Sequence, residues 1–172
     1  AFVLNACQSY EQGATLVEKG SRGGVVTLAE VVHSAATVVG RAMARLLNSG
    51  FTLRSALSIA RTEIEVSIEY VTVGSGGLTL CQNGNGTPLS YLIRETEKDY
   101  TIIPHVHPSE SYGIGTLANS IVEKSEVHYL AAGSIRPFRR TKEEIVSLLD
   151  RDLLPVRFDD KLHWSNNISD LL

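Results

Sequence analysis

Two amphipathic repeats do most to limit the folds open to this chain. Between residues 32 and 47, apolar side chains recur three and four positions apart, and residues 53–64 repeat the pattern. The positions are Val32, Ala35, Ala36, Val39, Ala42, Met43, Leu46 and Leu47, then Leu53, Ala56, Leu57, Ala60 and Ile64. The arginines of both segments fall outside these stripes. The pattern predicts two helices, each with one apolar face.

Short runs rich in β-branched residues flank these helices, at residues 24–28 and 70–74, and Gly50 and Gly74 mark breaks between elements. Helices that alternate with such strands predict an α/β fold, with helices flanking a mostly parallel sheet. The sheet of this segment would keep one edge unpaired. We therefore expect self-association through that edge when the segment is isolated.

Cys7 follows an apolar run, residues 2–4, and precedes the polar residues Gln8 and Ser9. A strand that delivers a thiol into a polar turn is one way in which nucleophilic cysteines are presented, because the thiol must be partly exposed and needs a group that takes its proton. No such partner is near in sequence, since the first histidine is His33. On residue types alone, a small buried hydrophobe is the commoner role for such a cysteine.

The first eighty residues hold an ordered set of motifs. Residues 4–9 read Leu-Asn-Ala-Cys-Gln-Ser, residues 46–50 read Leu-Leu-Asn-Ser-Gly, and residues 56–61 read Ala-Leu-Ser-Ile-Ala-Arg. Together with the strands at 24–28 and 70–74, this order resembles the C-terminal half of a CHAT domain, in the caspase- and separase-like cysteine protease family. The resemblance covers roughly residues 1–82.

The resemblance implies a cysteine endopeptidase with Cys7 as nucleophile and a protein as substrate, without a cofactor. In the family the histidine base lies on a strand that precedes this segment, and the chain opens on Ala1 inside an expected strand. We therefore expect a C-terminal fragment whose partner is the N-terminal half of the same protein. The chain alone would be inactive, because a thiol without its base loses activation.

The chain departs from the family at residues 29–34, Ala-Glu-Val-Val-His-Ser, where many members have a tryptophan and an acidic residue. His33 could replace the missing base, but it is more simply a residue of the first helical turn, where polar side chains satisfy free N–H groups. We expect the Cys7 N–H to be an oxyanion donor and Gln8 and Ser9 to line the substrate cleft. Ser9 could equally begin a helix, and Asn5 could be engaged by backbone.

Charge and cysteine content exclude several classes of function. The net charge is −3, and the main basic cluster is the short run 136–140, so neither nucleic acid nor a membrane surface is expected as partner. Two cysteines match no zinc pattern, and Cys81 reads as a buried strand thiol. The sequence contains no apolar run of membrane-spanning length and no secretory leader, and a free thiol favours the cytoplasm.

The polar, glycine-rich residues 83–88 predict a boundary between a first domain, residues 1–83, and a second, residues 84–172. The second is expected to be a small β-rich α+β module, with strands near residues 90–93, 100–103, 127–130 and 155–158. Thr141 and Glu144 form a capping box for one helix. The tail, with its pair Trp164 and Ser165, resembles tails behind CHAT segments of some archaeal proteins.

His105 and His107, with Glu110 nearby, are the other constellation of interest, because alternate positions on a strand share one face and two imidazoles could begin a zinc site. The flanking prolines favour an extended edge with solvated histidines instead, so no metal is expected. Residues 74–77 lack the lysine of a phosphate loop and read as a turn. Three hypotheses remain: a cysteine endopeptidase, an inactive protein-interaction or scaffolding module, and a metal or ligand site in the tail centred on His105 and His107.

Overall fold

A computed structural model describes residues 1–62, 69–80, 89–107, 116–117, 129–130, 133–134, 137–149 and 154–172. Within these residues the chain is an α/β protein with mixed sheets and flanking helices. It divides near residue 83 into two compact units, each with its own sheet. Ile64, Cys81, the boundary 83–88, Glu110, residues 127–128 of a predicted strand and Arg136 lie outside the described residues.

The first unit is built on a three-stranded sheet in the order β1-β2-β3. Strand β1 (Phe2–Val3) runs parallel to β2 (Gly23–Thr27), which is antiparallel to β3 (Tyr70–Gly74). The expectation of a mostly parallel sheet is thus met in one of the two pairings. The central β2 is buried along its whole length, and its β-branched Val25, Val26 and Thr27 are typical of such a strand.

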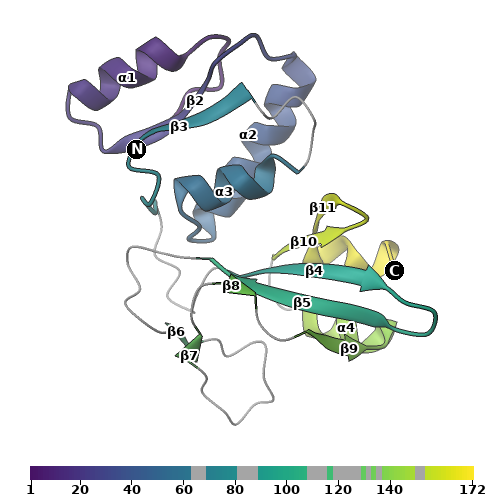
Figure 1. Cartoon of the computed structure of the whole chain (residues 1–172). Helices are drawn as coiled ribbons and strands as arrows, with labels where there is room; N and C mark the ends of the chain where they lie inside the picture. Colours follow the sequence, from purple (N-terminus) through teal and green to yellow (C-terminus); the bar gives the residue numbers. More distant parts are fainter. Residues whose placement is uncertain are drawn as a thin grey trace. The chain divides into compact units, whose positions relative to one another are not determined.

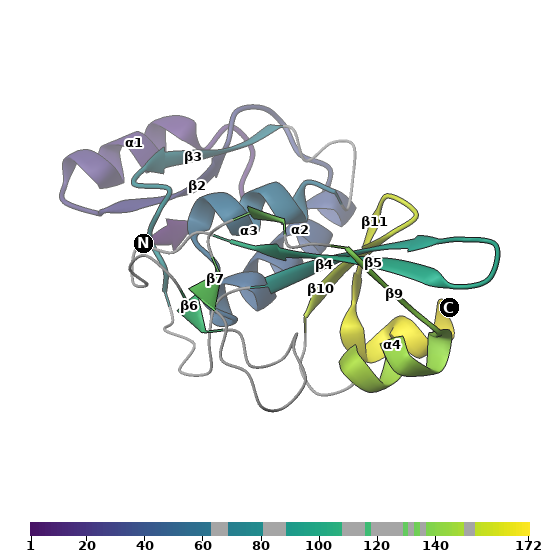
Figure 2. The same cartoon turned by 60° about the horizontal axis from the view of Figure 1, so that its bottom comes forward.

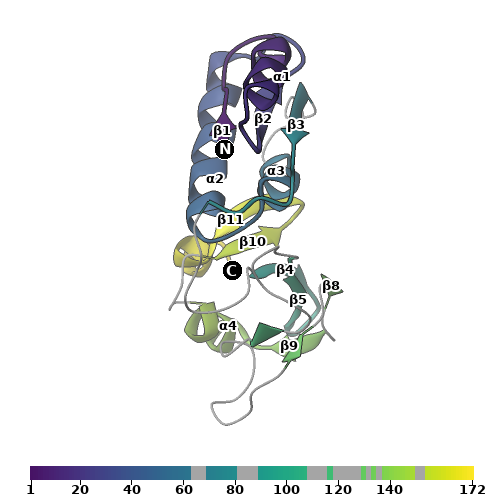
Figure 3. The same cartoon turned by 90° about the vertical axis from the view of Figure 1, so that its left-hand side faces the viewer.

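Helices cover both faces of this sheet (Figure 1): α1 (Tyr10–Glu18) lies on one side, and α2 (His33–Asn48) and α3 (Leu53–Ala60) on the other. Both apolar stripes face inward, as predicted, and Arg41 and Arg54 point to solvent. The buried stripe begins later than expected, at Ala35, because Val32 precedes α2 and is 64% exposed. Figure 3 shows α2 running beside β1.

The turns of the first unit follow from its glycines and caps. Gly50 ends the α2 segment with φ +86° and Gly74 ends β3 with φ +69°, both in the left-handed region that glycine enters without strain. The Thr52 hydroxyl caps α3 by accepting a hydrogen bond from the Ser55 N–H at 3.1 Å. The turn predicted at residues 74–77 is present.

The second unit is built on a six-stranded sheet in the order β11-β10-β4-β5-β8, with β9 also paired to β5. The long hairpin of β4 (Leu89–Glu95) and β5 (Tyr100–Val106) is its centre. The remaining strands are β8 (Gly133–Ser134), β9 (Phe138–Arg140), β10 (Pro155–Phe158) and β11 (Lys161–Trp164), and a separate pair is formed by β6 (Thr116–Leu117) and β7 (Tyr129–Leu130).

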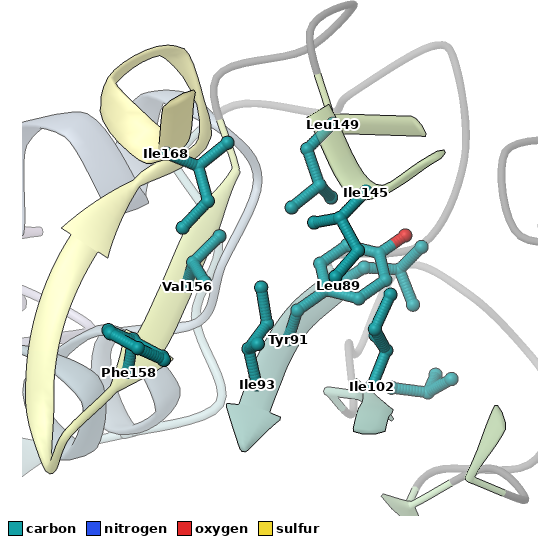
Figure 4. Packing of buried hydrophobic residues seen from close by; sticks show 10 residues of the cluster. Leu89, Tyr91, Ile93, Ile102, Ile145, Leu149, Val156, Phe158 and Ile168 are labelled. Atoms are coloured by element: carbon teal, nitrogen blue, oxygen red, sulfur yellow. The ribbon is translucent and has the colours of Figure 1, made fainter. Parts of the chain in front are cut away.

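One face of this sheet is covered by α4 (Lys142–Leu149) and the 3₁₀ helix η2 (Ser165–Asp170), which lie together on the same side of the hairpin (Figure 2). Their apolar residues close a core with the inward positions of β4, β5 and β10, as Figure 4 shows for Ile145, Leu149 and Ile168. The predicted capping box starts α4: the Thr141 N–H donates to Glu144 Oε2 at 2.9 Å. Among the described helices, none is long and apolar enough to cross a membrane.

Candidate functional site

Cys7 lies in the turn that leaves the carboxyl end of β1. The Leu4 N–H still donates to the Val25 carbonyl oxygen at 2.8 Å, which continues the parallel pairing by one residue, and the chain then turns. Cys7 is exposed, and the next residue, Gln8, adopts a left-handed conformation with φ +52°. That conformation is uncommon outside glycine and asparagine. The left-handed conformation of Gln8 turns the chain from Cys7 toward the start of α1.

The loop between β2 and α2 fixes the position of the sulfur. The Val31 N–H donates to Cys7 Sγ at 3.4 Å, and Sγ lies 3.8 Å from the Val31 carbonyl oxygen. The Gln8 N–H donates to the Ala29 carbonyl oxygen at 3.2 Å in the same loop. Hydrogen bonds to residues 29–31 therefore hold two successive residues of the turn. The thiol is exposed, but the turn that carries it is fixed by these contacts.

Ser9 takes a position different from the one expected. It was expected to line the cleft, yet it is only 3% exposed, and its hydroxyl lies 3.1 Å from the Leu4 carbonyl oxygen. The Ser9 hydroxyl oxygen also accepts a hydrogen bond from the Thr27 N–H at 3.0 Å. Ser9 is the residue before α1, as the alternative held. Its hydroxyl links the end of β1 to β2 through these two hydrogen bonds, because a buried hydroxyl needs hydrogen-bond partners.

Asn5 and Tyr70 form a second group of hydrogen bonds that holds the turn. The Asn5 side-chain amide donates to the Ala36 carbonyl oxygen of α2 at 2.7 Å, and the Tyr70 hydroxyl donates to Asn5 Oδ1. Asn5 is thus engaged by backbone, as one interpretation of the sequence held. The sequence around Tyr70 gives no sign of this hydrogen bond, because Tyr70 lies on β3, 65 residues from Asn5 along the chain.

Tyr70 is also electrostatically linked to Cys7. Burial raises the pKa of the Tyr70 phenol above its usual value, and the negative charge of an ionised Cys7 raises that pKa further. Desolvation disfavours the phenolate, and a nearby anion disfavours it again. The buried phenol therefore stays protonated and keeps its hydrogen bond to Asn5 across the ordinary pH range.

Gln8 and the Cys7 N–H keep the positions that a substrate contact needs. Gln8 is exposed beside Cys7. Within the described part of the chain, no acceptor takes a hydrogen bond from the Cys7 N–H. A donor that is not already engaged can serve a developing oxyanion. Neither role is visible from these contacts alone, and both remain predictions.

No described histidine contacts Cys7. His33 opens α2, two residues after the Val31 contact, but its side chain is exposed and forms no hydrogen bond with Cys7. The residue before α2 is Val32, and no side chain caps this helix. His33 thus lies in the first turn of the long helix, as expected, and no hydrogen bond that would make it a helix cap is seen among the described contacts.

The histidine pair of the second unit is brought together. His105 and His107 have ring centroids 4.6 Å apart, and His107 Nε2 lies 2.7 Å from the Ser90 hydroxyl on β4. Ser90 was missed by sequence reasoning, although its place opposite His105 follows from the alternation of the two strands. Burial, and secondarily the charge of His105, lower the pKa of His107 to about 4.

The described residues thus contain two separate polar clusters, one around Cys7 in the first unit and one around His107 in the second. Within the described residues, no group of three or more histidine, cysteine or acidic side chains is placed to hold a metal ion. Comparison with known proteins adds no assignment: no family of proteins, no curated protein and no solved structure matches this chain.

Proposed function

We propose that the first unit carries the nucleophile of a cysteine endopeptidase of the caspase-like, CHAT type. Cys7 would attack the carbonyl carbon of a peptide bond in a protein substrate. The observation that carries the proposal is the exposed Cys7 thiol on a turn fastened by Val31 and Ala29 at the carboxyl end of a strand. In open α/β sheets, ligands bind outside the carboxyl ends of the strands.

The braces around the turn support this proposal. A nucleophile must be held close to the geometry of attack, because displacement of about 1 Å can cost about 100-fold in rate. The Ser9 hydroxyl joins the base of the turn to β2, and Asn5 joins its start to α2. Both contacts are hydrogen bonds to backbone groups, which leaves the sulfur itself exposed.

The proposed chemistry divides between groups of this chain and a base from another segment of the full protein. The Cys7 sulfur forms the bond to the carbonyl carbon, and the Cys7 N–H would stabilise the oxyanion that develops. The base takes the thiol proton and returns it to the leaving amine, and water then releases the acyl group. Gln8, exposed next to the sulfur, is the residue that we propose to contact the substrate.

A matched pair of cysteine variants tests the proposal. The chain together with its proposed N-terminal half is incubated with a denatured protein substrate, and fragments are identified by mass spectrometry for the wild type, Cys7→Ser and Cys81→Ser. We expect Cys7→Ser to lose cleavage by at least about 1,000-fold and Cys81→Ser to retain it. Equal cleavage by wild type and Cys7→Ser would contradict the proposal.

A second candidate, a catalytically inactive interaction or scaffolding module, is favoured by the apolar surface near the same turn. Leu28 and Val32, at the two ends of the loop that holds Cys7, are 51% and 64% exposed, and Tyr10 at the start of α1 is also exposed. Exposed apolar side chains that form a contiguous surface often mark protein-binding sites. A pull-down that compares Leu28→Ser and Val32→Ser with Cys7→Ser separates the two candidates. A docking module should lose its partner in Leu28→Ser and in Val32→Ser, and should keep it in Cys7→Ser.

A further inference from the structure

We propose that His105 and His107 chelate one divalent transition-metal ion on the second unit, with Ser90 holding the orientation of the His107 ring. The site is independent of the chemistry proposed for Cys7. His105 lies on β5 and His107 follows its last residue, Val106, which is buried in the core between them. Their side chains therefore share the face of the sheet opposite to the core.

The spacing of the rings fits a shared ion. A metal ion bound at about 2.0–2.1 Å from an imidazole nitrogen lies about 3.2 Å from the ring centroid. When each ring turns one nitrogen toward a shared ion, centroids 4.6 Å apart correspond to a nitrogen–metal–nitrogen angle of about 90°. The ring planes are inclined by 69°, so the rings meet edge to face and are not stacked.

That angle selects among metals. Square-planar and octahedral ions hold neighbouring ligands at about 90°, as Cu²⁺ and Ni²⁺ prefer, whereas a tetrahedral Zn²⁺ site needs about 110°. The order of intrinsic affinities also places Cu²⁺ first among these ions. We therefore expect Cu²⁺ and Ni²⁺ to bind more tightly than Zn²⁺.

Ser90 supplies the outer contact that metal-binding histidines ordinarily have. Its hydroxyl lies 2.7 Å from His107 Nε2. When Nε2–H donates to this oxygen, the lone pair that can bind a metal is on Nδ1, and the ring is held in orientation. Ser90 is directly opposite His105 in the register of β4 and β5, so all three side chains belong to one small patch.

Among the described residues, no third histidine, cysteine or carboxylate joins the pair. Water would complete the coordination, which implies exchangeable binding rather than a permanent structural ion.

Calorimetric titration with Ni²⁺ tests the inference on the full chain, in a Cys7→Ser, Cys81→Ser background that removes thiol ligands. We expect one site, weakened at least about tenfold by His105→Gln and by His107→Gln, and by about 10-fold in Ser90→Ala through loss of the outer contact. His163→Gln is the matched control, because His163 is a half-buried histidine on β11 of the same sheet. The same samples with Cu²⁺ should show two coordinated nitrogens by electron paramagnetic resonance.

Unchanged Ni²⁺ binding in the His105→Gln, His107→Gln double variant would overturn the inference, as would tighter binding of Zn²⁺ than of Ni²⁺. Circular dichroism and Trp164 fluorescence establish that each variant is folded. If His107→Gln unfolds, His105→Gln decides the question, because His105 has no part in the Ser90 contact.

Discussion

At the scale of single residues, Tyr70 reports the charge of Cys7. A thiolate near the phenol disfavours a second negative charge, so it raises the pKa of Tyr70 beyond the effect of burial. Replacing the thiol by a neutral hydroxyl in Cys7→Ser should therefore lower the Tyr70 pKa, although burial keeps it above the ordinary value. Titration of ¹³C-labelled tyrosine followed by NMR measures this change.

Cys81→Ser is the control for that titration, because it makes the same chemical change at the other cysteine of the chain. We expect the Tyr70 pKa to be the same in Cys81→Ser and in the wild type. An identical Tyr70 titration in Cys7→Ser would mean that the two groups do not interact.

Ser9 holds the turn through buried hydrogen bonds, and its removal should be costly. Ser9→Ala leaves the Thr27 N–H without the oxygen to which it donates, and the Leu4 carbonyl oxygen without its donor. A buried polar group left unpaired costs about 1–3 kcal/mol. We expect the free energy of unfolding of the first unit to fall by that amount, measured by urea denaturation followed by circular dichroism. Exposed Ser58 on α3 is the control, and Ser58→Ala should change stability little.

At the scale of elements, Gly13 sets how closely α1 can approach the sheet. A methyl group at this position would lie 2.3 Å from Val26 Cγ1 and 3.3 Å from side-chain atoms of Phe2 and Val73. Val26 is fully buried and cannot move aside. Gly13→Ala gains about 1 kcal/mol of helix propensity but loses about 1–3 kcal/mol by overpacking. We therefore expect net destabilisation in a urea melt, whereas Thr15→Ala on the exposed side of α1 should be nearly neutral.

The elements were largely predictable from sequence because their signals are local. The stripe of α2, the capping box of α4 and the strands β4, β5 and β10 follow from periodicity and caps within one segment. The direction of β3 was not predictable, because a run of β-branched residues has the same pattern in parallel and antiparallel sheets. The bond from Tyr70 to Asn5 was hidden for a related reason: it joins residues 65 positions apart.

The candidate sites show the same limit. The sequence indicated Cys7 from its place between an apolar run and a polar turn, but it could not tell whether the Ser9 hydroxyl faces a cleft or the core. That depends on Thr27, which is 18 residues away and presents both its N–H and its hydroxyl to Ser9. Contacts of this kind are fixed by tertiary packing, and the pattern of a single segment does not contain them.

At the scale of the whole molecule, two units with separate sheets should respond differently to pH. His107 has its pKa lowered to about 4 by burial and by His105, against about 6.5 in an unfolded chain. Between these values the unfolded state binds the proton and the folded state does not, so stability is lost as pH falls. The full loss is about 3 kcal/mol, and it is complete below about pH 4.

Trp164, the only tryptophan, is 7% exposed on β11 and reports unfolding of the second unit by fluorescence. Urea midpoints measured by Trp164 should fall between pH 6.5 and pH 4 in the wild type, and this fall should be reduced in His107→Gln, because glutamine has no proton to gain. His163→Gln should retain the wild-type pH dependence. If wild type and His107→Gln lose stability in parallel over this range, other groups bind the protons, and the imidazole of His107 is not held neutral by the fold.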